Sequence, residues 1–379
     1  MHSLILTLLL VVTVTNGLPA DRLTAAIKDR YIVVFEDNVV VDDLVRSLEL
    51  ESFSIGGKFD VARRYYTALK GMAVTLDEKS LKLVKRMPGV KYVDSDAIAT
   101  IDDVSSWGLD RIDQRDLPYD NTFDIDGDGT GVTVYVLDTG IRDTHVEFGQ
   151  NGRAVKADAD FVGDGRNGED CHGHGTHCAG TAAGGIHGIA RNANIVSVRL
   201  FDCEGRGSAA DMVAAIDYTA SIATLPAVMS MSFGLFYRPA VDQAVAGAAA
   251  AGIVPVAAAG NSDADACWYS PARAEAAITV GATDNTDTRA YFSNYGSCVD
   301  IFAPGVNIVS SIQTSDTATD AWSGTSMACP HVAGVAAVLL GNNPGMSPSE
   351  VREAILSDAT NNRLTDEQSG SPNKLLYID

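Results

Sequence analysis

Long apolar runs are almost absent from this 379-residue sequence. The run at residues 4–14 is too short to cross a bilayer as a helix, because a membrane span needs about 20 residues. A short apolar run near the N-terminus that ends in small and polar residues is typical of a secretion signal. We therefore expect residues 1–17 to be a signal peptide, the protein to be secreted and extracellular, and no segment to anchor it in a membrane.

Basic residues are scarce in most of the chain. The sequence holds 28 Lys and Arg against 49 Asp and Glu, for a net charge of −21. Residues 1–101 contain 13 of each sign, which leaves 15 basic and 36 acidic residues for 102–379. An acidic surface argues against nucleic acid and anionic membranes as partners, and it supplies carboxylates for hard cations such as calcium. Solubility explains the same excess equally well.

Cysteine is absent from residues 1–101, and six cysteines follow in 102–379. In an oxidising compartment some of the six should pair, although the spacing alone leaves the pairing open. The polar stretch 94–106 lacks periodicity and is typical of a linker. Charge, cysteine content and this linker divide the chain into a first domain that ends near residue 101 and a second domain, 102–379.

The two parts have different secondary-structure patterns. The first is expected to be a small α+β unit, with strands at 31–36, 71–76 and 90–93 and helices at 41–50 and 78–86. In the second, continuous apolar runs alternate with Ala- and Gly-rich helical stretches. Continuous apolar strands are typical of a parallel sheet covered on both faces. We therefore expect an α/β fold with a mainly parallel central sheet and helices on both faces, with function gathered at the carboxyl ends of the strands.

One serine stands between small residues in Gly324-Thr325-Ser326-Met327-Ala328, where an extended run at 312–322 gives way to an apolar helix. The unpaired N–H groups of a helix start would stabilise negative charge that develops beside Ser326. Ser and Thr favour helix caps in any case, so the motif alone is weak evidence for a nucleophile. A serine nucleophile also needs a base, and the base needs an acidic partner.

Suitable partners stand at the ends of other elements. Asp138 closes the apolar run 132–138, and His174 lies in a glycine-rich segment at the start of a helical stretch. Each alone is commonly structural, but the order Asp, His, Ser is that of a known catalytic triad. Asn261 closes a further apolar run and can donate to an oxyanion. A lipase or esterase would instead need a Gly-x-Ser-x-Gly elbow and the order Ser, Asp, His, and both are missing around Ser326.

The segment 171–178 has a second interpretation as a zinc site, because it holds three histidines and two cysteines. No Glu stands between paired histidines as in a zinc-protease helix, and no second ligand cluster is evident in the sequence. We therefore favour the triad over zinc.

The four segments that carry Asp138, His174, Asn261 and Ser326 resemble those of the subtilisin-like serine proteases, in particular the proteinase K branch. Subtilisin itself has its triad in this order along the chain and uses an asparagine as an oxyanion donor. Residues 31–96 resemble the inhibitory pro-domain of these enzymes. Residues 102–379 resemble the catalytic domain, in which 107–115 and 293–296 are further signature stretches.

This resemblance implies a role for each residue. Asp138 would orient His174, His174 would act as general base and then as general acid, and Ser326 would attack the scissile carbonyl. Asn261 and the Ser326 amide would hold the oxyanion. An extended substrate would add as a strand between two edges, above a pocket of small residues. The edges would be Gly205, Arg206 and Gly207 on one side and Ser232, Phe233 and Gly234 on the other, and Ala258 and Gly260 would line the pocket.

The resemblance also implies disulfides and structural calcium, with no catalytic metal. The expected disulfides are Cys171 with Cys203 and Cys267 with Cys298. Cys178 resembles a free cysteine of the family, and Cys329, where relatives carry Thr or Ser, is expected to be buried and reduced. A disulfide between Cys178 and Cys329 stays open as an alternative. One expected calcium site is Asp300 with the carbonyls of Glu275 and Ala277, and the other is Asp110, Asp113, Gln114 and Asp120.

The sequence thus predicts a secreted proenzyme with a signal peptide (1–17), an inhibitory pro-domain (18–101) and a catalytic domain (102–379). Self-cleavage is expected near residues 99–102. The mature form is expected to be a monomeric serine endopeptidase that works through an acyl-enzyme. It would act on proteins or peptides with broad specificity and favour an apolar or aromatic residue before the cut bond. The alternative is a catalytically silent binding protein on the same fold.

Overall fold

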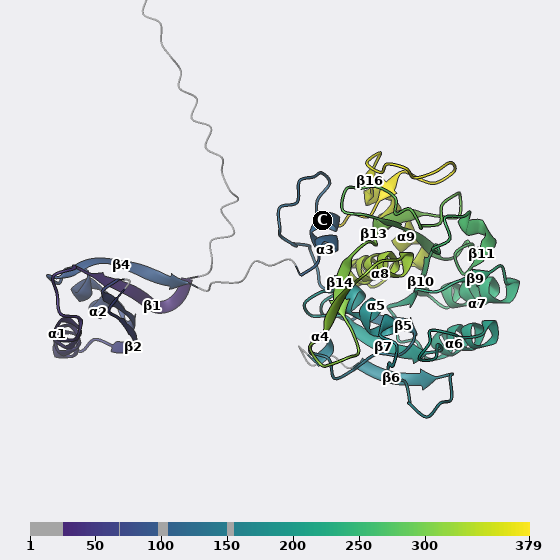
Figure 1. The fold of residues 1–379 in the computed structure, drawn as a ribbon. Helices are drawn as coiled ribbons and strands as arrows, with labels where there is room; N and C mark the ends of the chain where they lie inside the picture. Colours follow the sequence, from purple (N-terminus) through teal and green to yellow (C-terminus); the bar gives the residue numbers. More distant parts are fainter. Residues whose placement is uncertain (1–25, 68, 98–104, 150–154) are drawn as a thin grey trace, which may run out of the picture. The chain divides into compact units, whose positions relative to one another are not determined.

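The computed structural model describes residues 26–67, 69–97, 105–149 and 155–379 (Figure 1). The chain divides into two compact units, Met1–Ile101 and Asp102–Asp379. The expected signal peptide and the expected self-cleavage region at 99–102 lie outside the described residues. Within the described ranges, no helix combines the length and the apolar character needed to span a bilayer.

The smaller unit is a four-stranded antiparallel sheet, in the order β2-β3-β1-β4, with two helices packed against it. Its elements are β1 (Ala26–Phe35), α1 (Val41–Ser54), β2 (Phe59–Tyr65), β3 (Gly71–Leu76), α2 (Glu78–Val84) and β4 (Val90–Ala97). Val33, Val45 and Leu48 are buried in the core between the sheet and α1. The α+β class is as expected. Strand β2 was not predicted, because most side chains of this edge strand are polar and lie partly or fully exposed.

The larger unit is built on a nine-stranded sheet in the order β16-β17-β13-β12-β10-β8-β5-β7-β6. Its strands are β5 (Thr133–Asp138), β6 (Val155–Asp160), β7 (Asn194–Arg199), β8 (Ala227–Met231), β10 (Ile253–Ala258), β12 (Ile278–Thr283), β13 (Ile301–Pro304), β16 (Thr360–Asn361) and β17 (Lys374–Leu375). Every neighbouring pair is parallel except β16 with β17. The central strands β5, β8, β10 and β12 are buried along their whole length.

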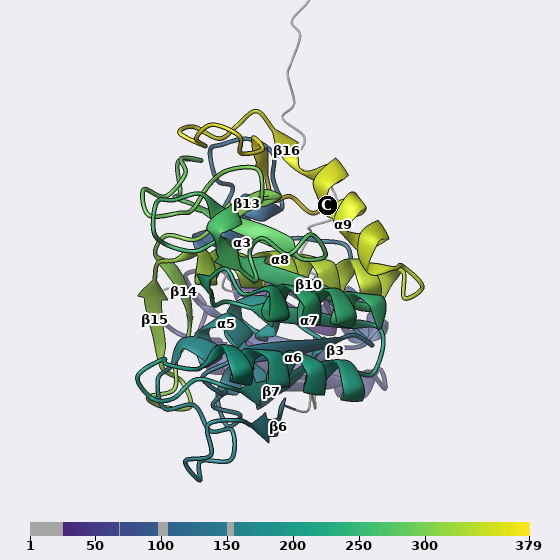
Figure 2. The ribbon, with the colours of Figure 1, turned by 90° about the vertical axis from the view of Figure 1, so that its right-hand side faces the viewer.

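Helices cover both faces of this sheet. On one face, α5 (His174–Ala183) and α8 (Thr325–Asn342) pack together, and α9 (Pro348–Asp358) packs against α8. On the other face, α6 (Ala209–Ile222) and α7 (Pro239–Ala250) lie side by side, as Figure 2 shows. The expected α/β fold with a mainly parallel sheet is confirmed.

Shorter elements complete the larger unit. They are α3 (Trp107–Ile112), α4 (Val146–Gly149), a 3₁₀ turn (Ala266–Trp268), the pair β9 (Leu235–Phe236) with β11 (Tyr269–Ser270), and the hairpin β14 (Ile308–Ser311) with β15 (Thr319–Trp322). This hairpin corrects the extended run expected at 312–322, of which only 319–322 is a strand. The helix after it begins at Thr325, so Pro330 lies in its second turn and not in its first.

Parallel strands bring their carboxyl ends to one edge of the sheet. Asp138 is the last residue of β5, and Asn261 follows three residues after the end of β10. His174 begins α5 and Ser326 is the second residue of α8, so both stand at helix N-termini. The fold therefore places these four residues at strand ends and helix starts.

Candidate active site

Asp138 and His174 form a hydrogen-bonded pair. The His174 Nδ1 atom lies 2.8 and 2.9 Å from the two carboxylate oxygens of Asp138. Asp138 is buried, and its Oδ1 also accepts the Thr139 N–H at 2.7 Å. Burial by itself lowers the pKa of His174, but the adjacent carboxylate outweighs it and holds that pKa well above the ordinary value. Asp138 therefore fixes the tautomer of the ring and stabilises its cation.

Ser326 and Ser232 bind each other through two reciprocal hydrogen bonds. The Ser326 Oγ donates to the Ser232 carbonyl at 3.0 Å, and the Ser232 Oγ donates to the Ser326 carbonyl at 2.9 Å. Cys178 Sγ lies 3.3 Å from the Ser326 carbonyl and 3.9 Å from His174 Nδ1, so the serine backbone and the imidazole share a neighbour. To donate to His174, the Ser326 hydroxyl must rotate away from Ser232. Catalytic hydrogen bonds often tighten only when substrate binds.

Pro330 explains why the Ser326 carbonyl is available for these contacts. In a regular helix this carbonyl would accept the N–H of residue 330, four positions later, but proline has none. The hydroxyl of Ser232 and the thiol of Cys178 satisfy it instead. The backbone of the candidate nucleophile is thus tied to β8 and α5 as well as to its own helix.

Asn261 is held with its amide group in a defined orientation. Its Oδ1 accepts both the Thr325 N–H at 2.8 Å and the Thr325 hydroxyl at 2.9 Å. Since both partners are donors toward this atom, Nδ2 is the group that stays available for donation. The Thr325 hydroxyl in turn accepts the Gly260 N–H at 3.1 Å. Thr325 therefore aligns the asparagine with the start of α8, where an oxyanion would lie.

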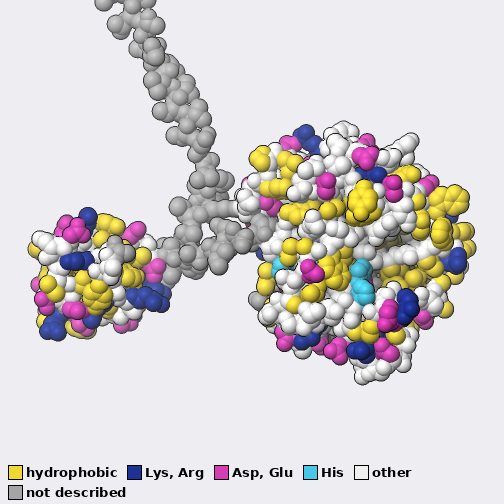
Figure 3. All heavy atoms as spheres, viewed as in Figure 1, with side chains coloured by type: hydrophobic (Ala, Val, Ile, Leu, Met, Phe, Trp, Pro, Cys, Tyr) yellow, Lys and Arg dark blue, Asp and Glu magenta, His cyan; other side chains and the backbone are white. Residues whose placement is uncertain are grey.

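The two candidate substrate edges come from different parts of the sheet. Residues 232–234 connect β8 to β9, and residues 205–207 lie in the loop after β7. Phe201 and Phe233 link the two regions through ring centroids 5.3 Å apart. The surface of the larger unit in Figure 3 shows histidine side chains with apolar side chains beside them.

Local structure explains the small residues at two positions that are expected to line the substrate pocket. Ala258, the last residue of β10, is 3% exposed. Gly260 has a φ of +104°, and a Cβ there would stand 2.4 Å from Asn294 Nδ2. Glycine is thus required at 260 by the backbone conformation and by the neighbouring amide.

The segment 171–178 does not gather its side chains around one point. Cys171 is bonded to Cys203, and the Nε2 of His177 lies 3.0 Å from the Ile308 carbonyl. Among the described residues, the one group of three side chains that could hold a metal is Asp138, His174 and Cys178, which is the candidate catalytic pair with its neighbouring thiol. The geometry therefore favours the triad over the zinc interpretation.

The cysteines pair as the resemblance implied. The structure joins Cys171 to Cys203 and Cys267 to Cys298. Cys178 and Cys329 are buried free thiols. Burial raises the pKa of Cys329 to about 12, which keeps this thiol protonated.

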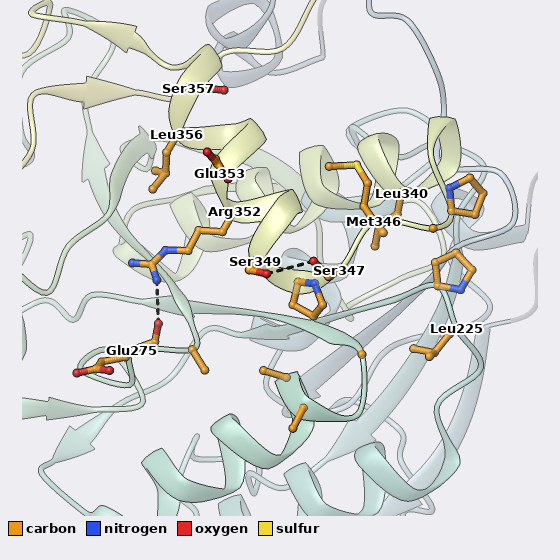
Figure 4. Close-up of a pocket in the computed structure, with 18 residues that line it drawn as sticks. Leu225, Glu275, Leu340, Met346, Ser347, Ser349, Arg352, Glu353, Leu356 and Ser357 are labelled. Carbon is orange, nitrogen blue, oxygen red and sulfur yellow. Dashed lines mark hydrogen bonds between the residues drawn. The ribbon is translucent and has the colours of Figure 1, made fainter.

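The calcium site expected at Asp300, Glu275 and Ala277 needs correction. Arg352 of α9 donates from Nη1 to the Glu275 carbonyl at 2.9 Å and from Nη2 to Asp300 Oδ1, and Figure 4 shows its guanidinium directed at Glu275. The other oxygen of Asp300 accepts the Thr279 N–H at 2.9 Å. A side-chain cation thus occupies the position expected for the metal, and these residues do not fit calcium. Sequence reasoning missed this because Arg352 lies 52 residues from Asp300.

The second expected calcium site keeps features of a cation site. Asp110 accepts the backbone N–H groups of Asp120 and Asn121 at 3.3 and 2.9 Å, and Asp113 Oδ2 accepts that of Asp124 at 2.8 Å. The other oxygen of Asp113 is buried and has no hydrogen-bond partner among the described residues.

Burial, together with the neighbouring carboxylates of Asp120 and Asp110, raises the pKa of Asp113 to about 6. Gln114 Oε1 points into the same loop, where it accepts the Asp120 N–H at 3.2 Å. An orphaned, buried carboxylate oxygen among like charges fits a bound divalent cation.

A pocket of about 1010 Å³ lies away from the candidate catalytic residues, and Glu275 and Arg352 are part of its lining (Figure 4). Its lining includes Leu225 and Gly252, which precede β8 and β10. It therefore opens at the amino ends of the strands, whereas Asp138 and Asn261 stand at the carboxyl ends. Despite its size, this pocket is not the candidate active site, because its lining residues do not include a nucleophile paired with a base.

Comparison with known proteins agrees with this geometry. Residues 129–375 match the model of the subtilase family, and residues 30–102 match the peptidase inhibitor I9 model. The chain is 44% identical to the alkaline serine exoprotease A of Vibrio alginolyticus, over 96% of this chain and 70% of that protein. It is 43% identical to an extracellular serine proteinase of a Thermus strain, over 93% of this chain and 90% of that one.

A solved structure supports the same assignment. The crystal structure of a cold adapted subtilisin-like serine proteinase superposes with a TM-score of 0.69 at 48% identity, and covers 72% of this chain and 98% of that one. The cuticle-degrading serine protease of Arthrobotrys oligospora is 40% identical over 93% of this chain and 91% of that protein. The chain therefore belongs to the subtilase family and is a serine protease with an inhibitor I9 pro-domain.

Proposed function

We propose that this protein is a secreted endopeptidase made as a self-processing proenzyme, with Asp138, His174 and Ser326 as its catalytic triad. The observation that carries the proposal is the Asp138–His174 pair at 2.8 Å, with Cys178 contacting both His174 and the Ser326 backbone. One relative is named an extracellular serine proteinase, which supports secretion.

The catalytic cycle follows from this arrangement. Ser326 Oγ attacks the scissile carbonyl and passes its proton to His174, while Asp138 stabilises the imidazolium. The oxyanion accepts hydrogen bonds from Asn261 Nδ2 and from the Ser326 N–H at the start of α8. His174 then protonates the leaving amine, and an acyl-enzyme remains on Ser326. Water, activated by His174, hydrolyses the acyl-enzyme.

Substrate specificity is proposed to be broad. An extended peptide would add as a strand between residues 205–207 and 232–234, so main-chain hydrogen bonds would supply much of the affinity. Ala258 and Gly260 leave room for an apolar or aromatic side chain before the cut bond. The I9 pro-domain would inhibit the enzyme until it is removed, and the mature enzyme is proposed to be a monomer with no nucleic-acid or membrane partner.

Structural calcium is proposed at one site only, formed by Asp110, Asp113, Gln114 and Asp120. Calcium would balance the like charges there and pair the orphaned oxygen of Asp113. It would hold the loop after α3 in place and would take no part in bond cleavage.

The test is hydrolysis of a chromogenic tetrapeptide with Phe before the leaving group, together with labelling by a serine-directed fluorophosphonate. Both should be present in the secreted protein and absent in Ser326→Ala. The Ser326→Ala precursor should also keep its pro-domain, whereas the parent sheds it. A parent that has lost its first 101 residues or so and is neither active nor labelled would favour the catalytically silent alternative.

A further inference from the structure

Asp170 is a buried carboxylate that takes no part in the proposed catalytic cycle. It is 5% exposed, and its two oxygens accept five hydrogen bonds. Oδ1 accepts from the Thr139 hydroxyl at 2.9 Å and from the backbone N–H groups of His172 and Gly173 at 2.9 and 2.8 Å. Oδ2 accepts from the N–H and the hydroxyl of Thr176 at 3.0 and 2.5 Å. One side chain thus joins the turn after β5 to the first turn of α5.

These partners flank the two residues of the candidate catalytic pair. Thr139 directly follows Asp138, and its N–H donates to the Asp138 carboxylate at 2.7 Å. The Thr139 hydroxyl also accepts the N–H of Gly175, the residue after His174, at 2.9 Å. A continuous chain of hydrogen bonds therefore runs from the Asp138 carboxylate through Thr139 and Asp170 to both sides of His174.

Asp170 also supplies the cap that α5 lacks in its own sequence. The N-cap residue is Gly173, which has no side chain to accept the free N–H groups of the first turn. From outside the helix, the Asp170 carboxylate accepts the N–H groups of Gly173 and Thr176, and a negative charge at a helix N-terminus is favourable. The start of α5, and with it the Cα of His174, is thereby fixed relative to β5.

We propose that Asp170 is the positioning residue that sets the distance and orientation between Asp138 and His174. The proposal rests on the proposed catalytic roles of those two residues. Asp170 contacts neither substrate nor reacting atoms. It acts through the backbone on both sides of the imidazole and through Thr139, which binds the catalytic carboxylate directly.

The test compares Asp170→Asn with a matched control. The asparagine amide can accept at only one of the two oxygen positions, so its NH₂ group would face the two Thr176 donors. A small displacement of a catalytic group can cost about 100-fold in rate. We therefore expect kcat to fall by about 10- to 100-fold while KM stays within about 2-fold. The downfield proton resonance of the Asp138–His174 hydrogen bond should shift or broaden.

The matched control is Asp284→Asn in the loop after β12. Asp284 Oδ1 accepts the N–H and hydroxyl of Thr286 at 2.9 and 2.8 Å and the N–H of Thr288 at 3.1 Å, a comparable set of local donors. This variant should keep kcat and the downfield resonance. If Asp170→Asn does not fold, Thr176→Val removes one of the five contacts and should give a smaller loss of kcat with the same unchanged KM.

The outcomes separate this proposal from the proposed function. Fluorophosphonate titration gives the fraction of competent sites, so kcat is expressed per labelled serine. If the parent is labelled and Asp170→Asn matches Asp284→Asn in kcat and in the resonance, the positioning role is wrong while the triad stands. If the parent itself is not labelled, the triad assignment fails first.

Discussion

Arg352 allows a direct test of whether its guanidinium takes the place of the calcium ion expected at Asp300. Its guanidinium binds the Asp300 carboxylate and the Glu275 carbonyl (Figure 4). Hydrogen bonds to charged groups contribute about 1.5–3 kcal/mol, and exposed ion pairs about 0–1 kcal/mol. The Arg352 side chain is 36% exposed and that of Asp300 is 14% exposed, so the contact lies between these cases. We expect Arg352→Ala to lower the free energy of unfolding by about 1–3 kcal/mol.

For a domain of this size, each kcal/mol lowers Tm by about 2–4 °C, so the expected loss is roughly 2–12 °C. The same substitution frees one oxygen of Asp300 and the carbonyl of Glu275, which are ligands of the kind that calcium takes. Calcium at a hundredfold excess over its Kd adds about 2.7 kcal/mol. Calcium should therefore restore most of the lost stability in the variant and add nothing at this site in the parent.

The assay is thermal unfolding of mature enzyme that has been inactivated with the fluorophosphonate, so that self-digestion does not obscure the transition. Parent and Arg352→Ala are each measured in a chelator and in excess calcium, and bound calcium is counted by titration calorimetry. The double variant Arg352→Ala/Asp300→Asn is the control, because it lacks the freed carboxylate. It should lose the additional calcium-dependent gain.

Two results would refute this reasoning. One is an equal number of bound calcium ions, with an equal gain in Tm, for the parent and Arg352→Ala. The other is a bound calcium ion that the parent loses on Asp300→Asn with Arg352 intact. Either would mean that the guanidinium does not take the place of the metal.

Three other perturbations have outcomes set by single contacts. Since His174 must be neutral to accept a proton and Asp138 holds the pKa of His174 well above 6.5, kcat/KM should rise with pH above 6.5. Asp138→Asn should move this rise to lower pH and lower kcat by about 10⁴-fold. A rise that stays at the same pH in the variant would contradict the assignment. Asp287→Ala leaves the fully buried Arg111 guanidinium unpaired and should cost about 3–5 kcal/mol in denaturant unfolding, whereas a loss below 1 kcal/mol would mean that water replaces the carboxylate. Chelation should accelerate thermal inactivation of the parent but not of Asp113→Asn, and equal acceleration in both would exclude Asp113 as a calcium ligand.

The fold class and the candidate catalytic residues were predictable from local sequence. Continuous apolar runs between helical stretches indicate a covered parallel sheet, because both faces of each strand must be buried. Asp138, Asn261 and Ser326 could be singled out because each stands at the end of an apolar strand or the start of an apolar helix. The edge strand β2 was missed, since its polar residues lack the pattern that burial imposes.

Other features depended on contacts between distant residues. Ser232 and Ser326 bind each other across 94 positions, and one of the two hydrogen bonds uses the Ser326 carbonyl, which Pro330 leaves without its helical partner. Asp170 directly precedes the segment 171–178, and four of its five hydrogen bonds come from residues within six positions, but the fifth comes from the Thr139 hydroxyl, 31 positions away, which only folding brings close.

Sequence by itself thus determined the class of fold, the order of the proposed triad and the chemistry available to it, because these follow from patterns within single strands and helices. Tertiary structure alone decided that Arg352 stands at Asp300 where calcium was expected, and that the Asn261 amide points its Nδ2 away from Thr325. The physical reason is that a side chain's partner is chosen by proximity in the folded chain, and local pattern carries no information about which distant donor arrives there.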